Sequence, residues 1–468
     1  MSAPAPARPT TSGAAPLPAS FARTLRFELV KLIAQWRIRV ILLCCLLAPG
    51  VFVAATGQQT SLPADTVFGR WMALSGWAGP LVVLAFAGVW ALPLLTSLVA
   101  GDVFAIEDRL GTWRHLVVTV RSPRRIFAAK ALASLIVVLT LMIAIALSAT
   151  LGGLLGVGSH PLVGLDGHMF GAGDVAGRVL LAWLVVVLPT LAYAAIGLLG
   201  SVTMGRSPIG LLLPALLALL VQVVQMLPLP AVVRLALPSN TFLAWRGLFT
   251  SPAQTGPIVV GLVVSLAWVV LATALAYRLF VRRDFTDLTN DGSARRIAVG
   301  GLLPLAALTA VSVAAVAVLT PVTGSGITRA TLQDSLSTSF SRLYVLQTAQ
   351  LHRPAVTEAA MQTASTCTKG GLAATSTTST TSAADAADPT QTGPGNDWRC
   401  IVSWHTPGTT FVGQATFQLD VTPDGRYVAD GDGPKEVNGS FPIHTAQGDA
   451  PNPLWQFDGL VDLLAPHR

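Results

Sequence analysis

The chain has 468 residues, of which only 11% are charged and 52% are hydrophobic, and its mean hydropathy is +0.62. A soluble domain carries about 25% charged residues, so this composition excludes an ordinary soluble protein and indicates a chain that lies largely in a lipid bilayer. Four cysteines are too few for a cysteine-rich metal scaffold.

The charges divide the chain into two parts. Residues 1–320 hold 22 basic and 10 acidic residues, whereas residues 321–468 hold 8 and 13. The two parts are therefore expected to face different environments. Because the arginines cluster beside apolar segments, we attribute the basic balance to membrane topology and expect no nucleic acid partner.

The N-terminal region precedes the first apolar stretch. Residues 1–19 are rich in Ala, Pro, Ser and Thr and are expected to form a disordered cytoplasmic tail. After them, apolar residues recur on one helical face, at Leu25, Leu29, Leu32, Ile33 and Trp36. This spacing predicts an amphipathic helix on the inner membrane surface, with Arg23, Arg26 and Lys31 near lipid phosphates. The alternative is a simple cytoplasmic extension of the first span.

Seven apolar stretches are long enough to cross a hydrocarbon layer of about 30 Å. They lie at 39–56, 75–100, 127–155, 178–203, 207–227, 257–281 and 297–320. Alternate segments then hold 18 basic residues on one side and only 4 on the other, namely Arg70, Arg178, Arg234 and Arg246. The positive-inside rule predicts a multi-pass protein of the cell inner (plasma) membrane, with a cytoplasmic N-terminus and an extracytoplasmic region from residue 321.

The loop at residues 101–126, between the second and third spans, is the densest charge cluster in the chain. Helix-compatible segments lie on both sides of Gly111, and Ser122-Pro123 is a helix-start signal with Ser as cap and Pro in the first turn. We expect a short amphipathic helix and a turn that project into the cytoplasm. The residues of interest are Glu107, Asp108, Arg109, Gly111, Thr112, Ser122, Pro123 and Lys130.

These residues resemble a known motif. Glu107, Gly111-Thr112, Arg121-Ser122-Pro123-Arg124 and Lys130 follow one another as in the loop of type-2 ABC exporter permeases, the membrane subunits of ATP-binding-cassette transporters. Arg206-Ser207 and the stretch 280–284 also resemble that family. The sequence departs from the family in its Ser-Pro order, a seventh span at 297–320 and a long tail.

The resemblance covers residues 20–290 and implies a six-span permease domain with an N-terminal amphipathic helix. It implies that the loop is a coupling element that receives the motion of a separate ATP-binding subunit, and that two permease subunits form a homo- or heterodimer in membrane lipid. An ordinary positive-inside loop is the alternative, but such a loop does not call for Glu107, Asp108 and the Gly-Thr pair.

The chain contains no Gly-Lys dipeptide and hence no phosphate-binding loop of the P-loop type. We therefore expect no catalytic residue and no cofactor in this chain, with ATP and Mg²⁺ bound by the partner subunit. His160, Asp166, His168 and Asp174 share one external loop, but their spacing matches no standard metal motif, and we expect no metal site.

Two amides, Gln222 and Gln225, lie on one face of the stretch 207–227. They serve either as hydrogen-bonding contacts between helices or as part of a polar translocation path. The expected function is export of a hydrophobic or amphipathic substrate, with drugs, lipids and peptides all open. The alternative is a non-transporting anchor or sensor that displays residues 321–468. The Ala- and Arg-rich composition hints at a bacterial source.

Residues 321–468 are expected to form a small α+β domain. Leu332, Leu336, Phe340 and Leu343 predict a helix, residues 370–395 a low-complexity linker, and residues 398–404 and 410–421 strands. The stretch 454–464 is expected to be a closing helix. Cys367 and Cys400 lie outside the cytoplasm and are expected to form a disulfide, which contributes roughly 3–4 kcal/mol.

Overall fold

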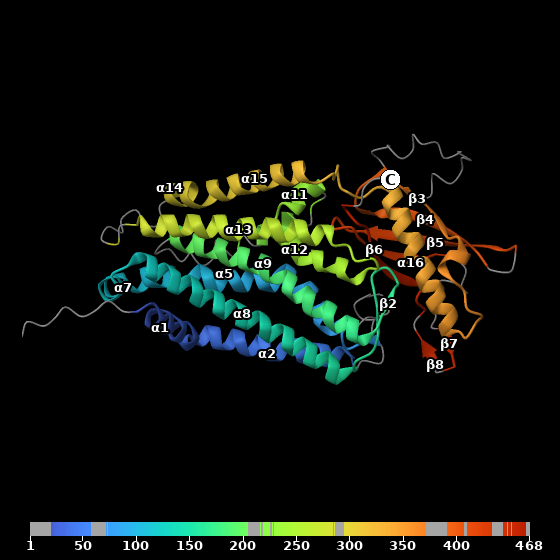
Figure 1. Ribbon diagram of the computed structural model, residues 1–468, viewed down its shortest axis with the longest axis horizontal. Coiled ribbons are helices and arrows are strands. Elements are labelled where there is room, and N and C mark those ends of the chain that lie inside the picture. The colour runs from blue at the N-terminus through green and yellow to red at the C-terminus, as the bar shows by residue number, and fades with distance from the viewer. Residues whose placement is uncertain are drawn as a thin grey trace, which may run out of the picture.

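A computed structural model describes residues 20–57, 72, 74–204, 216, 219–224, 227, 229–283, 285, 294–370, 391–406, 410–432, 443–446, 448–450 and 452–464. The predicted tail at 1–19, the central linker residues 371–390 and Gln225 lie outside these residues. A bundle of long helices runs along the molecule, and a strand-rich domain is stacked on one end of it (Figure 1).

Six helical segments among the described residues are long and apolar enough to span a membrane. This confirms a multi-pass membrane protein. The segments are α2 (Trp36–Gly57), α4–η1–α5 (Ala78–Phe86, Ala87–Ala91 and Leu92–Asp102), α8 (Pro123–Gly156), α9 (Ala172–Met204), α13 (Gly256–Val281) and η3–α15 (Ala298–Leu302 and Leu303–Leu319). The expected span at 207–227 falls mostly outside the described residues, so a count of seven is not shown.

The helix α9 occupies the centre of the bundle, with α5 and α13 packed against it, whereas α2 packs along α8. Of the most apolar part of α9, 61% is buried, against 11% for α15, which therefore lies on the periphery. Small residues allow the close approach of α2 and α8. A Cβ added at Gly152 would lie 2.3 Å from the carbonyl oxygen of Gly50, and the Gly50 N–H donates to Ser148 Oγ at 2.9 Å.

The strand-rich domain consists of α16 (Arg329–Gln350) packed on a five-stranded antiparallel sheet of order β3-β4-β5-β6-β9. The strands are β3 (Ala364–Lys369), β4 (Gly395–His405), β5 (Val412–Val421), β6 (Arg426–Gly431) and β9 (Gln456–Leu460). The predicted apolar face of α16 is buried on the sheet. Its Phe340 ring lies 4.9 Å from Trp404 and 6.0 Å from Phe417, between ring centroids.

The predicted disulfide is confirmed, and the predicted closing helix is wrong. Cys367 of β3 and Cys400 of β4 lie directly opposite each other and are bonded. The stretch 454–464 contains the strand β9, which pairs with β6. A Cβ at Gly459 would lie 1.9 Å from the ring of Tyr427, the residue directly opposite in β6, so glycine at this position leaves room for that ring.

Short elements join the bundle to the strand-rich domain. They are β1 (Leu162–Val163), β2 (Met169–Phe170), α11 (Ala231–Leu235), α12 (Pro238–Ala244) and η2 (Trp245–Phe249). Further short elements are α14 (Ala294–Ile297), α17 (Glu358–Met361), β7 (Ile443–Thr445) and β8 (Gly448–Ala450).

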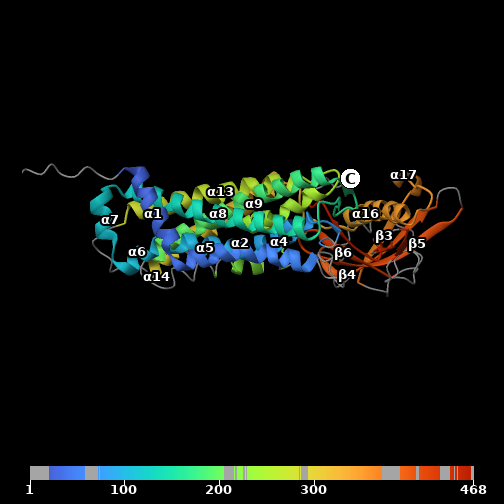
Figure 2. The same ribbon diagram turned by 90° about the horizontal axis from the view of Figure 1, so that it is seen from below.

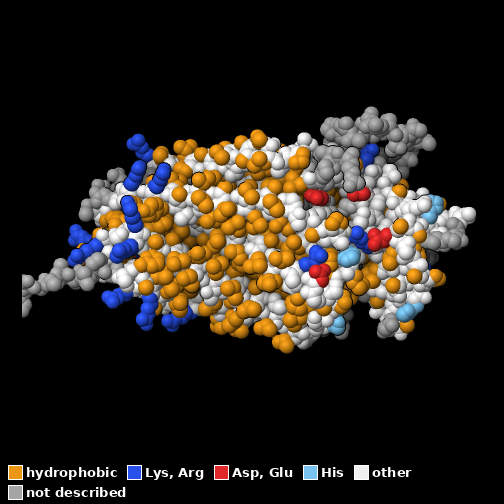
Figure 3. Space-filling model, in the orientation of Figure 1, with side chains coloured by type: hydrophobic (Ala, Val, Ile, Leu, Met, Phe, Trp, Pro, Cys, Tyr) orange, Lys and Arg blue, Asp and Glu red, His pale blue; other side chains and the backbone are white. Residues whose placement is uncertain are grey.

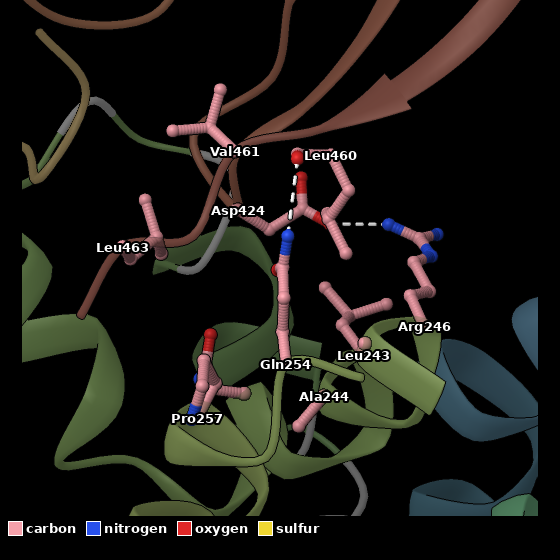
Figure 4. Close-up of a pocket in the computed structure, with 11 residues that line it drawn as sticks. Leu243, Ala244, Arg246, Gln254, Pro257, Asp424, Leu460, Val461 and Leu463 are labelled. Carbon is pink, nitrogen blue, oxygen red and sulfur yellow. Dashed lines mark hydrogen bonds and ion pairs between the residues drawn. The ribbon is translucent and has the colours of Figure 1, made fainter. Parts of the chain in front are cut away.

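Ionic contacts fasten the domain to the bundle. Arg246 of η2 forms an ion pair with Asp424, and Gln254 Nε2 donates to the Leu460 carbonyl at 3.3 Å (Figure 4). Burial disfavours the charge of Asp424, but Arg246 and its neighbours hold the carboxyl pKa below its usual range. Asp166, considered above as a metal ligand, instead pairs with Arg342 of α16 and accepts from the Ser251 N–H at 2.6 Å.

Candidate functional site: the loop between α5 and α8

The loop lies at the end of the bundle opposite the strand-rich domain, beside α1 (Phe21–Ala34) (Figure 2). It forms two short helices, α6 (Ala105–Leu110) and α7 (Trp113–Val120). Gly111 ends α6 with φ of 67°, a left-handed conformation that favours glycine. Ser122 caps α8 by accepting from the Arg125 N–H, with Pro123 in the first turn.

A buried charge cluster joins the loop to two other helices. Lys130 Nζ of α8 lies 2.8 Å from Glu107 Oε1 of α6 and 2.8 Å from Glu28 Oε2 of α1. Lys31 of α1 also pairs with Glu107, and Thr112 donates a hydrogen bond to the same carboxylate. We call Glu28, Lys31, Glu107 and Lys130 the four-charge cluster; two cations balance two anions.

Burial and charge act in opposite directions on Glu107. Its side chain is 0% exposed, and burial alone would raise the carboxyl pKa. The charge of Lys130 and hydrogen bonds from Lys130, Lys31 and Thr112 outweigh burial and lower the pKa from 4.5 to about 2. Glu107 is therefore ionised throughout the physiological pH range and binds α1 and α8 to the loop.

The neighbouring Asp108 anchors the loop to α13. Arg283, just beyond the end of α13, binds both carboxylate oxygens of Asp108, and Trp113 Nε1 donates to Asp108 Oδ1 at 2.6 Å. The Trp113 ring also packs 5.5 Å from Phe280 of α13. Both members of the ion pair are almost fully buried, with side chains 1% and 2% exposed. A bidentate pair of this kind holds both position and orientation.

A third contact involves Asp102 at the end of α5. It pairs with Arg109 of α6 and, at 2.8 Å, with Arg37 of α2. Ser201 Oγ of α9 accepts from the Phe104 and Ala105 N–H groups, each at 3.0 Å. Contacts from α1, α2, α8, α9 and the end of α13 thus converge on one short loop, which is held rigidly to the bundle.

A groove of about 670 Å³ separates α1 from α6 and α7. Apolar side chains line most of it, and Phe27, Val30 and Leu110 are 55%, 60% and 62% exposed. Lys31, Glu107 and Thr112 also line the groove. A body that fits into this groove therefore reaches the four-charge cluster through Lys31, whose side chain is 25% exposed and pairs with the buried Glu107.

The structure brings most of the predicted loop residues together. Glu107, Asp108, Arg109, Thr112 and Lys130 make the contacts above, Gly111 forms the turn, and Ser122 and Pro123 lie beyond α7 as the start of α8. Gln222 lies elsewhere; it is 3% exposed, and its Nε2 has no partner among the described residues.

Sequence reasoning missed Glu28, Arg37, Asp102 and Arg283 as partners. Lys31, expected near lipid phosphates, instead pairs with Glu107. The separate helix α1 offered one clue, because Glu28 and Lys31 lie three residues apart on one face. No local pattern indicates that this face meets Lys130, which is 102 residues from Glu28.

The spans and the convergent loop define a multi-pass membrane protein with an anchored, charged loop at one end. Residues 24–171 match the model of the family described as ABC-2 family transporter protein, which confirms the resemblance to a type-2 ABC permease. The matched stretch includes all of the four-charge cluster and α6 and α7, but not Arg283. No curated protein matches the chain.

Proposed function

We propose that the chain is the membrane subunit of an ABC exporter that moves a hydrophobic or amphipathic substrate out of the cell. ATP and Mg²⁺ bind to a separate subunit, and two permease subunits, identical or different, form the transporter. The family match supports a permease of an ABC transporter. The observation that carries the coupling to a separate ATP-binding subunit is the anchored loop, because a rigid loop transmits the motion of a docked subunit to the helices that hold it.

The charge distribution supports a cytoplasmic position for this loop. Lys and Arg side chains gather at the α7 end of the bundle, a broad apolar belt follows, and acidic side chains lie at the strand-rich end (Figure 3). By the positive-inside rule, the α7 end faces the cytoplasm and residues 321–468 lie outside. The disulfide Cys367–Cys400 fits an oxidising compartment at that end.

The groove between α1 and α6–α7 is the docking site that we assign to the ATP-binding subunit. Its exposed apolar residues lie next to Glu107 and Lys31, so a docked subunit presses on the four-charge cluster. Motion of that subunit then passes through Lys130 into α8, through Glu28 into α1 and through Arg283 into α13.

Groove variants test this assignment. Val30→Asp and Leu110→Asp place charges in the groove and are expected to abolish co-purification with the ATP-binding subunit, which we expect a neighbouring reading frame to encode. Phe411→Asp is the matched control, because Phe411 is an exposed apolar residue of the strand-rich domain at 66% exposure. Normal binding and normal coupled ATPase activity of the groove variants would refute the docking site.

The orientation has its own test. His115 is exposed on α7, and a cysteine at this position in intact cells is expected to resist reagents that do not cross the membrane. Labelling from outside would reverse the topology. It would then leave the anchor or sensor function as the better explanation, because no cytoplasmic motor could reach the loop.

A further inference from the structure

A second cavity lies at the other end of the bundle, between the β1–β2 hairpin and the strand-rich domain. Its volume is about 310 Å³, within the range of about 300–1,000 Å³ that is typical of small-molecule sites. Apolar side chains from both bodies line it, among them Leu162, Val163, Met169, Leu343, Leu346 and Phe457. Neither the loop site nor the groove at α1 extends to it.

Some polar groups in this cavity are hydrogen-bonded or ion-paired within the protein. Asp458 pairs with Arg426, and Gln456 Nε2 donates to Asp430 at 2.6 Å. By contrast, the Oε1 atom of Gln350 is buried and has no donor among the described residues. A buried acceptor without a donor is costly, so this oxygen favours a ligand that carries a hydroxyl or an amide N–H.

The cavity lies at the level where the helices leave the apolar belt. Leu74 and Met169, which contribute to the lining, are 47% and 50% exposed. Nearby, Trp77 Nε1 donates to Ser159 Oγ at 2.9 Å beyond the outer end of α8, where Leu155 is 84% exposed. Tryptophan is enriched at the membrane–water interface. In the orientation proposed above, acyl chains of the outer leaflet therefore lie beside the exposed apolar border of the cavity.

We propose that this cavity binds one outer-leaflet amphiphile, with its alkyl chain among the apolar residues and a hydroxyl or amide N–H donating to Gln350 Oε1. A water-soluble ligand does not account for an apolar border at bilayer level. The leaflet of the ligand rests on the orientation proposed above, but binding needs neither ATP nor an ATP-binding subunit, so the site goes beyond the proposed permease function.

Photolabelling of the full-length protein in lipid nanodiscs tests the site. The probe is a monoacylglycerol with a diazirine in its acyl chain, and labelled residues are mapped by mass spectrometry. We expect labels on α16 and the β1–β2 hairpin. Ala450→Trp fills the cavity and is expected to lower this labelling at least tenfold, whereas Ala446→Trp on the same β7–β8 hairpin, outside the lining, leaves it unchanged.

Two further variants keep the proposal testable. Leu346→Trp fills the cavity from α16 and replaces Ala450→Trp if that variant does not fold. Gln350→Leu is expected to remove a severalfold preference of the wild type for the monoacylglycerol over the methyl ester with the same chain. Equal labelling of the wild type and the cavity-filling variants would overturn the proposal. Labels confined to the exposed faces of α2, α8 and α15 would do the same, because they would indicate ordinary lipid contact.

Discussion

Replacement of Glu107 by Gln tests the four-charge cluster most directly. The variant keeps the size of the side chain but removes the carboxylate charge that Lys130 and Lys31 share, so that Glu28 is the carboxylate that still pairs with Lys130. The lowering of the Glu107 pKa from 4.5 to about 2 corresponds to about 3 kcal/mol of stability. This agrees with the roughly 3–5 kcal/mol lost when one member of a buried ion pair is removed.

The stabilisation by Glu107 is expected to decrease as the pH falls. Because the folded state lowers the pKa of Glu107, its contribution is complete above pH 4.5 and is lost as the pH falls toward about 2. The difference in unfolding free energy between wild type and Glu107→Gln, measured by denaturant titration in micelles, is expected to be about 3 kcal/mol at pH 7 and about half of that at pH 3.

Glu358→Gln provides a control with the same chemistry. Glu358 pairs with Arg342 at 3.3 Å, but its side chain is 51% exposed, so a change below about 1 kcal/mol is expected. A difference for Glu107→Gln as small as that of the control, or one that does not depend on pH between 7 and 3, would refute the role of the cluster.

Three further substitutions probe other contacts. Arg283→Gln removes the cation that binds both carboxylate oxygens of its buried aspartate partner and is expected to lose about 3–5 kcal/mol in the same denaturant assay, whereas the exposed neighbour Arg282→Gln changes little. Gly153→Leu places a Cβ 2.1 Å from a facing backbone carbonyl and should cost at least about 2 kcal/mol by thermal unfolding; Gly173→Leu, with no atom within 4 Å, is the matched control. Cys400→Ala opens the disulfide and is expected to lower the stability of the strand-rich domain by about 3–4 kcal/mol, read from its proteolysis; equal protease resistance with and without reductant in the wild type would contradict this.

The lengths and hydropathy of the apolar stretches were sufficient to predict most helices of the bundle, because an apolar run of about 20 residues has few alternatives to a membrane span. The helix α16 was predictable for a similar reason, since Leu332, Leu336, Phe340 and Leu343 recur at helical spacing. The strand β9 was not. Its apolar residues also fit helical spacing, and only the pairing with β6 across Gly459 and Tyr427 decides for a strand.

In the loop, too, some features were predictable from the sequence and others were not. Residue types marked Glu107 and Lys130 as notable, and the Ser-Pro signal located the start of α8. The partners of these charges were not predictable, because Glu28 and Arg283 reach the loop from distant parts of the chain, 102 and 175 residues from Lys130 and Asp108 respectively. Charges near span ends satisfy the topology rule whether they are paired or free, so the rule carries no information on pairing.

The end-on position of the strand-rich domain restricts any route through the molecule. The domain stacks along the long axis of the bundle (Figure 1). The ion pairs Arg246–Asp424 and Arg342–Asp166 hold it there. A substrate that travels along that axis is therefore blocked by the strand-rich domain. In the proposed exporter, the path out of the membrane therefore runs around this domain rather than through it, and the Arg246–Asp424 pair links any movement of the domain to η2.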